Sequence, residues 1–158
     1  MNNLIRERKH RLDTDCYKGF VRVHFTLCVK DKRCVFTNEK IFNQLQQILI
    51  EQLTIHCVVS DVFLFMPDHA HILLTGNHDN AYVYQCIVKF KQRSGYLFSR
   101  EYPDVVWQKD FYDHIVRKDE DTEKVIMYIL ENPVRKEFVD DWKVYPFKGS
   151  TIHNFNEW

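Results

Sequence analysis

The chain has 158 residues, of which 45% are hydrophobic and 15% aromatic, so a disordered chain is excluded and one globular domain with a sizeable core is expected. Its 22 basic residues balance its 22 acidic ones, so the strongly basic composition of many DNA-binding proteins is absent. Five cysteines, odd in number and without a Cys-x-x-Cys pair, argue against a disulfide framework or a cysteine zinc site and favour a reducing, cytoplasmic setting.

The first third of the chain predicts a strand followed by a helix. Residues 1–17 are expected to form a polar N-terminal arm rich in basic side chains. Residues 19–30 alternate between apolar and polar side chains, as in a strand with one buried face. After Asn38, a residue type that caps helices, apolar residues recur at helical spacing up to about residue 56.

The middle of the chain predicts a hairpin and a second helix. Residues 57–66 are β-branched and aromatic, which is typical of a strand that is buried on both faces. A Pro-Asp turn at 67–68 leads into a partner strand at 69–75, and residues 81–100 predict a helix.

The last third predicts two short strands, at 105–107 and 111–116, and a third helix at 119–131 that ends before Pro133. A tail, 142–158, could cover the sheet, bind DNA or mediate pairing of chains. The order β-α-β-β-α-β-α predicts an α+β fold, a ferredoxin-like or RRM-like sandwich in which helices pack mainly on one face of an antiparallel sheet. One domain would span residues 1–158. No apolar run reaches the length of a membrane span, so no membrane partner is expected.

Two histidines, His69 and His71, flank Ala70 at the start of the predicted partner strand. The period of two in a strand places both imidazoles on one face, with roughly 7 Å between their Cα atoms. Two imidazoles can then reach one divalent ion, and a carboxylate, amide or water can complete its ligands. Two histidines on a solvated strand face are the alternative. Of the other histidines, His114 is a secondary candidate because its predicted strand could approach the pair.

Tyr128 lies on the third predicted helix, roughly 130° from the centre of its apolar face. It is therefore poorly placed as a core residue, and Lys124 and Asn132 share its stripe one turn to either side. A phenol is a poor nucleophile near neutral pH unless its surroundings assist it, and a metal-bound phosphate with a nearby cation would do so. A half-exposed surface tyrosine is the alternative.

Residues 83–100 contain basic side chains and no acidic one, so they could form a DNA-binding face. The candidates are Lys89, Lys91, Arg93 and Arg100, interleaved with Phe90, Tyr96 and Phe98. Some of these aromatics must form the apolar face of the helix, and a solvated helix surface is the alternative. Trp107, Phe111 and Tyr112 are expected to pack in the core or on the sheet.

Three segments together resemble the single-tyrosine HUH transposases, and most closely the REP-associated tyrosine transposases. They are MPDHAHILL (66–74), WQKDFYDHIVR (107–117) and YILENPVRKEFV (128–139), and the likeness runs over roughly residues 18–148. Asp68 and Ala70 stand where the family usually has Asn and Val. These departures spare both histidines, the tyrosine and the Asn-Pro pair.

The resemblance implies a metal-dependent, single-stranded DNA transesterase that cuts and rejoins DNA beside hairpins through a 5′-phosphotyrosine intermediate. Carried over by position, it makes Tyr128 the nucleophile and His69, His71 and Asn132 the ligands of Mg²⁺ or Mn²⁺. Lys124 joins the candidate DNA contacts. Single-stranded DNA with a hairpin is the expected partner, and a monomer and a homodimer both remain open. The alternatives are a catalytically silent DNA- or RNA-binding regulator of the same fold and a metal-dependent nuclease that uses water.

Overall fold

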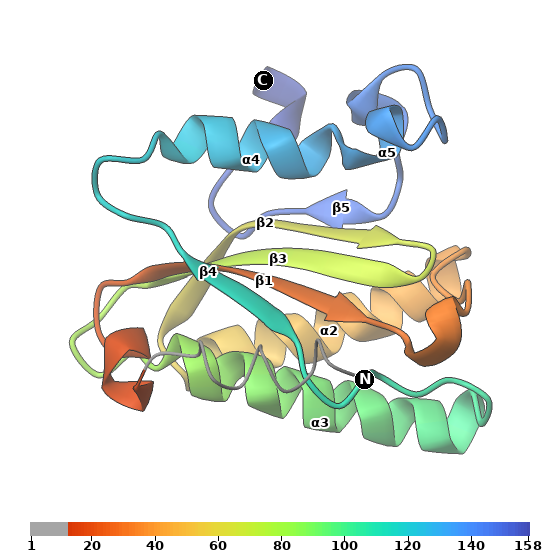
Figure 1. Cartoon of the computed structure of the whole chain (residues 1–158), viewed down its shortest axis with the longest axis horizontal. Helices are drawn as coiled ribbons and strands as arrows, with labels where there is room; N and C mark the ends of the chain where they lie inside the picture. The colour runs from red at the N-terminus through yellow and green to blue at the C-terminus, as the bar shows by residue number, and fades with distance from the viewer. Residues whose placement is uncertain (1–12) are drawn as a thin grey trace.

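The computed structural model of the chain describes residues 13–158. Within these residues, five antiparallel strands form one sheet in the order β4-β1-β3-β2-β5 (Figure 1). The strands are β1 (Arg22–Cys28), β2 (Val58–Met66), β3 (His69–Gly76), β4 (Tyr112–Ile115) and β5 (Lys148–Gly149).

Helices lie on both faces of this sheet (Figure 1). The long helices α2 (Glu39–Ile55) and α3 (Val83–Glu101) cover one face, as predicted, and α4 (Thr122–Leu130) lies over the other with the short α5 (Asn132–Arg135). Four 3-10 turns complete the structure: η1 (Thr14–Tyr17), η2 (Lys30–Lys32), η3 (Trp142–Val144) and η4 (Phe155–Glu157). The predicted α+β sandwich is confirmed, and the third predicted helix is the one that takes the opposite face.

The larger core fills the space between the sheet and the helices α2 and α3. Alternate residues of β1, including Phe25 and Leu27, point into it with no more than 1% of their surface exposed. The start of α2 agrees with the sequence, since Asn38 caps it by accepting a hydrogen bond from the Ile41 amide at 3.1 Å. The expected strand at 105–107 is reduced to an isolated bridge between Val29 and Trp107, because Trp107 turns into this core.

The smaller core lies beneath α4. Ile126, Ile129 and Leu130 pack there against the opposite face of β2, and the C-terminal tail adds Trp142 and Tyr145. The tail therefore covers part of the sheet, and β5 extends the sheet by pairing with β2. Within residues 13–158, no helix is long and apolar enough to cross a membrane.

A buried polar network fastens the beginning of α4 to the sheet. Asp61 occupies an irregularity in β2 and its side chain is 2% exposed. It accepts hydrogen bonds from the Thr75 hydroxyl and from Arg22 Nε, the latter at 3.4 Å. Arg22 Nη1 also donates to the Thr122 hydroxyl, 3.0 Å away in the first turn of α4.

The predicted N-terminal arm does not extend to residue 17. Tyr17 belongs to the folded domain, because it is fully buried and its hydroxyl donates to Asp113. The basic side chains of the arm fall in residues 1–12, outside the described part of the chain.

Candidate active site

The sheet face beneath α4 is apolar on β2 and polar on β1 and β3. Because side chains alternate along a strand, Arg22, His24 and Thr26 of β1 turn away from the larger core and toward this face. Thr26 is the cross-strand partner of His71, so the predicted histidine pair lies beside this polar row. The sheet therefore gathers the imidazoles of His24, His69 and His71 on one side.

The imidazoles of His69 and His71 lie next to each other, with ring centroids 4.9 Å apart and planes at 84°. Nδ1 of His69 lies 2.6 Å from an oxygen of Asp68, the turn residue before it. His71 is only 9% exposed, which is less than expected for a histidine on a solvated strand face. Each ring has a polar neighbour at its Nδ1, Asp68 for His69 and His24 for His71.

Asn132 reaches the histidine pair from the other side of this layer. Helix α4 ends at Leu130, and α5 begins at Asn132 with Pro133 in its first turn. This break turns the Asn132 side chain inward, where it is 7% exposed, and its Nδ2 donates to His71 Nε2 at 2.7 Å. Only Glu131 separates the two helical segments, between Tyr128 with Lys124 on α4 and Asn132 on α5.

Tyr128 on α4 has 58% of its surface exposed, in agreement with its predicted angle from the apolar face. Arg135 holds it in two ways. The guanidinium carbon lies 4.1 Å from the centre of the phenol ring, and Nη2 donates to the Tyr128 carbonyl at 2.6 Å. A cation therefore lies against the phenol.

The buried imidazoles are neutral at neutral pH. Burial, together with the nearby His24, His69 and Arg135, lowers the pKa of His71 to about 3. Burial, followed by the charge on His114, lowers the pKa of His24 to about 4. A neutral imidazole has the lone pair that a metal ligand needs.

Sequence reasoning missed two residues of this site, His24 and Arg135. His24 Nε2 lies 3.0 Å from His71 Nδ1, although His24 belongs to another strand and to no recognisable histidine spacing. The available signal was the alternation of β1, which places His24 on the polar face. His114, the secondary candidate, lies beside His24 on β4, but it is exposed and its Nε2 contacts Glu120 at 3.2 Å.

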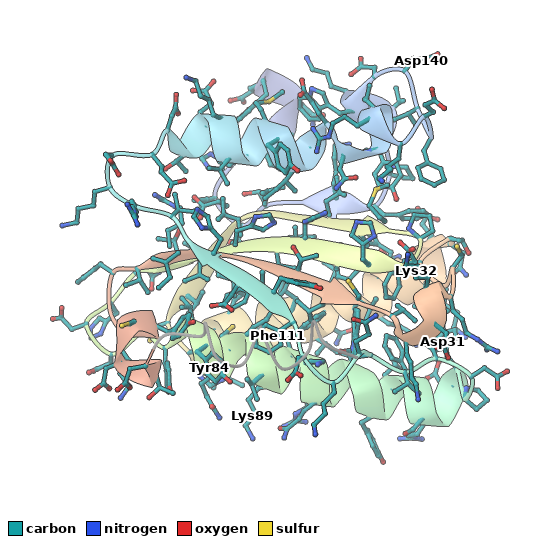
Figure 2. All side chains as sticks on the ribbon, in the orientation of Figure 1. Asp31, Lys32, Tyr84, Lys89, Phe111 and Asp140 are labelled. Carbon is teal, nitrogen blue, oxygen red and sulfur yellow. The ribbon has the colours of Figure 1, made fainter. Side chains whose placement is uncertain are left out.

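Most of the candidate DNA-binding residues lie away from this site, on α3 and thus on the other side of the sheet. Lys89 extends from α3 away from the sheet (Figure 2). Lys91 donates to the Lys109 carbonyl at 2.6 Å, and Arg100 lies over the exposed ring of Tyr96. The remaining candidates are Arg93, exposed on α3, and Lys124, exposed on α4 one turn before Tyr128. Lys124 alone among these five candidates shares a helix with the tyrosine.

The predicted packing of the aromatics around α3 is correct except at Tyr112. Phe90 and Phe98 are fully buried, and Trp107 and Phe111 are no more than 6% exposed. Tyr112 is 49% exposed at the edge strand.

The donors around His71 can accommodate a divalent ion. Residues 13–158 contain no group of three or more His, Cys, Asp or Glu side chains arranged to bind a metal. Two imidazoles nevertheless lie together with the side-chain amide of Asn132, a group whose oxygen can bind a metal ion. Such a set leaves coordination positions for water or phosphate oxygens, as Mg²⁺ and Mn²⁺ require.

The chain matches the model of a known family over most of its length. The sequence model described as "Transposase IS200 like" matches residues 19–132, which include both histidines, Tyr128 and Asn132. The chain belongs to the IS200-like transposase family. This transposase is 24% identical over 142 residues to a Haemophilus influenzae protein classified as a REP-associated tyrosine transposase, covering 79% of this chain and 77% of the relative.

Two solved structures share the fold of the transposase. One is a REP-associated tyrosine transposase bound to a REP hairpin, with a TM-score of 0.74, 19% identity, and coverage of 88% of this chain and 80% of that one. The other is described as a transposase of Deinococcus radiodurans, with a TM-score of 0.53, 19% identity, and coverage of 77% and 97%.

Proposed function

We propose that this transposase cuts and rejoins single-stranded DNA, with Tyr128 as the nucleophile and His69, His71 and Asn132 as ligands of a divalent ion. The contact between Asn132 and His71 carries the proposal, because it joins the segment that bears the tyrosine to the strand that bears the histidines. Tyr128 precedes Asn132 by four residues, and we propose that its phenol reaches the same region.

The ion would be Mg²⁺ or Mn²⁺, held by the imidazoles of His69 and His71 and by the amide oxygen of Asn132. Bound there, it would polarise the scissile phosphate and orient it toward the tyrosine. Because His71 is neutral, its ring needs to lose no proton before it binds the ion.

The reaction exchanges one phosphodiester for another. The Tyr128 oxygen bonds to phosphorus and loses its proton, and the bond to the 3′ oxygen breaks, which leaves a 3′-hydroxyl and a 5′-phosphotyrosine. A second 3′-hydroxyl can attack the phosphotyrosine and rejoin the DNA, so the exchange needs no ATP. Arg135 keeps the phenol in one orientation and adds a positive charge where the phosphate must approach.

The substrate we propose is single-stranded DNA beside a short hairpin. The solved relative bound to a REP hairpin supports it. Lys124 is placed to contact a strand at the tyrosine. The α3 candidates, Lys89, Lys91, Arg93 and Arg100, could be reached only by DNA that continues around the edge of the sheet.

The test is an assay for a covalent adduct. Wild type, incubated with Mn²⁺ and a hairpin-containing single strand, should form an SDS-resistant protein–DNA adduct, and Tyr128→Phe should form none. Tyr96→Phe is the matched control, since Tyr96 is similarly exposed, at 63%, but lies on α3.

Adduct formation by Tyr128→Phe would show that another residue is the nucleophile. Cleavage by wild type without any adduct would favour a nuclease that uses water, and binding without cleavage would favour a regulator.

A further inference from the structure

His24 contacts His71, the better buried of the two histidines proposed as metal ligands. Its Nε2 lies 3.0 Å from His71 Nδ1, and the two ring centroids are 5.2 Å apart. The hydroxyl of Thr26, on the same strand, is the next neighbour of that nitrogen at 3.3 Å. No role follows for His24 from the proposed chemistry, because it lies on the far side of His71 from Asn132.

The contacts of His71 fix where its proton resides. Asn132 Nδ2 is only a donor, so His71 Nε2, at 2.7 Å, must accept. A neutral imidazole carries one N–H, which then lies on Nδ1 of His71 and requires an acceptor. The nearest acceptor is His24 Nε2, whose own ring proton must then lie on its Nδ1.

We propose that His24 is a positioning residue that holds His71 in the Nδ1–H tautomer and so keeps the Nε2 lone pair directed toward Asn132. The inference rests on the proposed function in one respect, namely that this lone pair binds the ion. A metal-ligating imidazole commonly donates its other N–H to a neighbour, which fixes both the tautomer and the orientation of the ring. His69 has a corresponding neighbour in Asp68, so each ligand has its own partner at Nδ1.

Loss of this acceptor allows the proton to move to Nε2 of His71, where it blocks the position that an ion needs. Removal of such an outer partner typically weakens metal binding by about 10- to 100-fold. Glutamine can replace His24 as an acceptor through its amide oxygen, whereas phenylalanine fills the space without one.

The first test uses the metal-free protein, labelled with ¹⁵N in its histidines. Long-range ¹H–¹⁵N NMR spectra distinguish a protonated ring nitrogen from an unprotonated one. In wild type, His71 should be protonated at Nδ1 and unprotonated at Nε2. His24→Gln should keep this tautomer, and His24→Phe should give Nε2–H or a mixture. Protonation of Nε2 in wild type itself would overturn the proposal, whether or not any variant folds.

The second test measures Mn²⁺ affinity by calorimetry. His24→Phe should bind Mn²⁺ about 10- to 100-fold more weakly than wild type, and His24→Gln should stay within a few-fold. His114→Phe is the matched control, since His114 is the cross-strand neighbour of His24 on β4 but does not contact His71.

Two outcomes separate the possible failures. If Thr26→Val loses the Nδ1–H tautomer and His24→Phe keeps it, Thr26 is the acceptor and the proposal for His24 is wrong. If wild type shows the expected tautomer but binds no Mn²⁺, the metal role in the proposed function fails while the contact between His24 and His71 stands.

Discussion

The side-chain amide of Asn132 lies 2.7 Å from Nε2 of His71, although 61 residues separate the two in the chain. Asn132 is 7% exposed and His71 is 9% exposed, so the contact is largely shielded from solvent. The contact connects the last helical segment with the central strands, and it brings the side-chain amide of Asn132 to the two imidazoles.

Substitutions at this contact should remove ion binding. His71→Ala and Asn132→Ala should each lower Mn²⁺ affinity by at least about 100-fold, because each removes a ligand rather than an outer partner. Asn132→Asp should retain binding because it keeps an oxygen ligand. Calorimetric titration measures all three, with His78→Ala in an exposed loop as the control. Equal affinity in wild type and both alanine variants would refute the ligand set.

Arg135 should affect the rate of adduct formation more than DNA affinity. Arg135→Lys keeps the charge but loses the flat guanidinium that lies 4.1 Å from the phenol ring and its hydrogen bond to the Tyr128 carbonyl. We expect single-turnover adduct formation to slow by about tenfold, which corresponds to about 1.4 kcal/mol. Lys136→Gln, at the exposed next position, is the control and should keep the wild-type rate.

The buried carboxylate of Asp61 should contribute to stability. Asp61→Asn leaves Arg22 without its anionic partner and weakens the link from the sheet to Thr122 in α4. Because the Arg22 side chain is 32% exposed, we expect a loss of about 2 kcal/mol in the free energy of unfolding, below the range for a fully buried pair. Urea unfolding measures it. Asp104→Asn, whose carboxyl is 83% exposed beside Arg33, should change stability by less than about 0.5 kcal/mol.

The salt dependence of DNA binding should show which basic residues contact the strand. If Lys89 and Arg93 each neutralise one phosphate, replacing both with glutamine should reduce the slope of log K against log salt by about 1.4. Lys124→Gln should reduce it by about 0.7, because this lysine lies one turn from the tyrosine. If only Lys124→Gln changes the slope, the DNA contacts the side of the sheet that carries α4 and not α3.

The neutral histidines should make the metal-free protein less stable in acid. The folded pKa values of His24 and His71, about 4 and about 3, lie below the ordinary value of 6.5. As pH falls below 6.5 the unfolded chain binds protons that the folded chain does not, so stability decreases until the folded pKa values are reached. The slope should approach about 1.4 kcal/mol per pH unit for each histidine. Urea unfolding between about pH 7 and pH 5, in EDTA, should show a shallower slope for His24→Gln.

Local sequence patterns were sufficient for much of this molecule. The period of two placed His69 and His71 on one face, and the helical period placed Tyr128 outside the apolar face of its helix, because both follow from backbone geometry alone. The N-cap at Asn38 and the end of α4 before Pro133 depend on neighbours within a few residues, so they were also predictable.

Tertiary structure decided which distant residues meet. The register of β1 against β3 brings His24 to His71, and the break between α4 and α5 turns Asn132 inward and sets Arg135 against Tyr128. The same packing places the basic stretch of α3 on the opposite side of the sheet from the tyrosine, a separation that charge along the sequence does not reveal. Strand register and the choice of sheet face depend on burial summed over the whole core, so no local window of residues contains them.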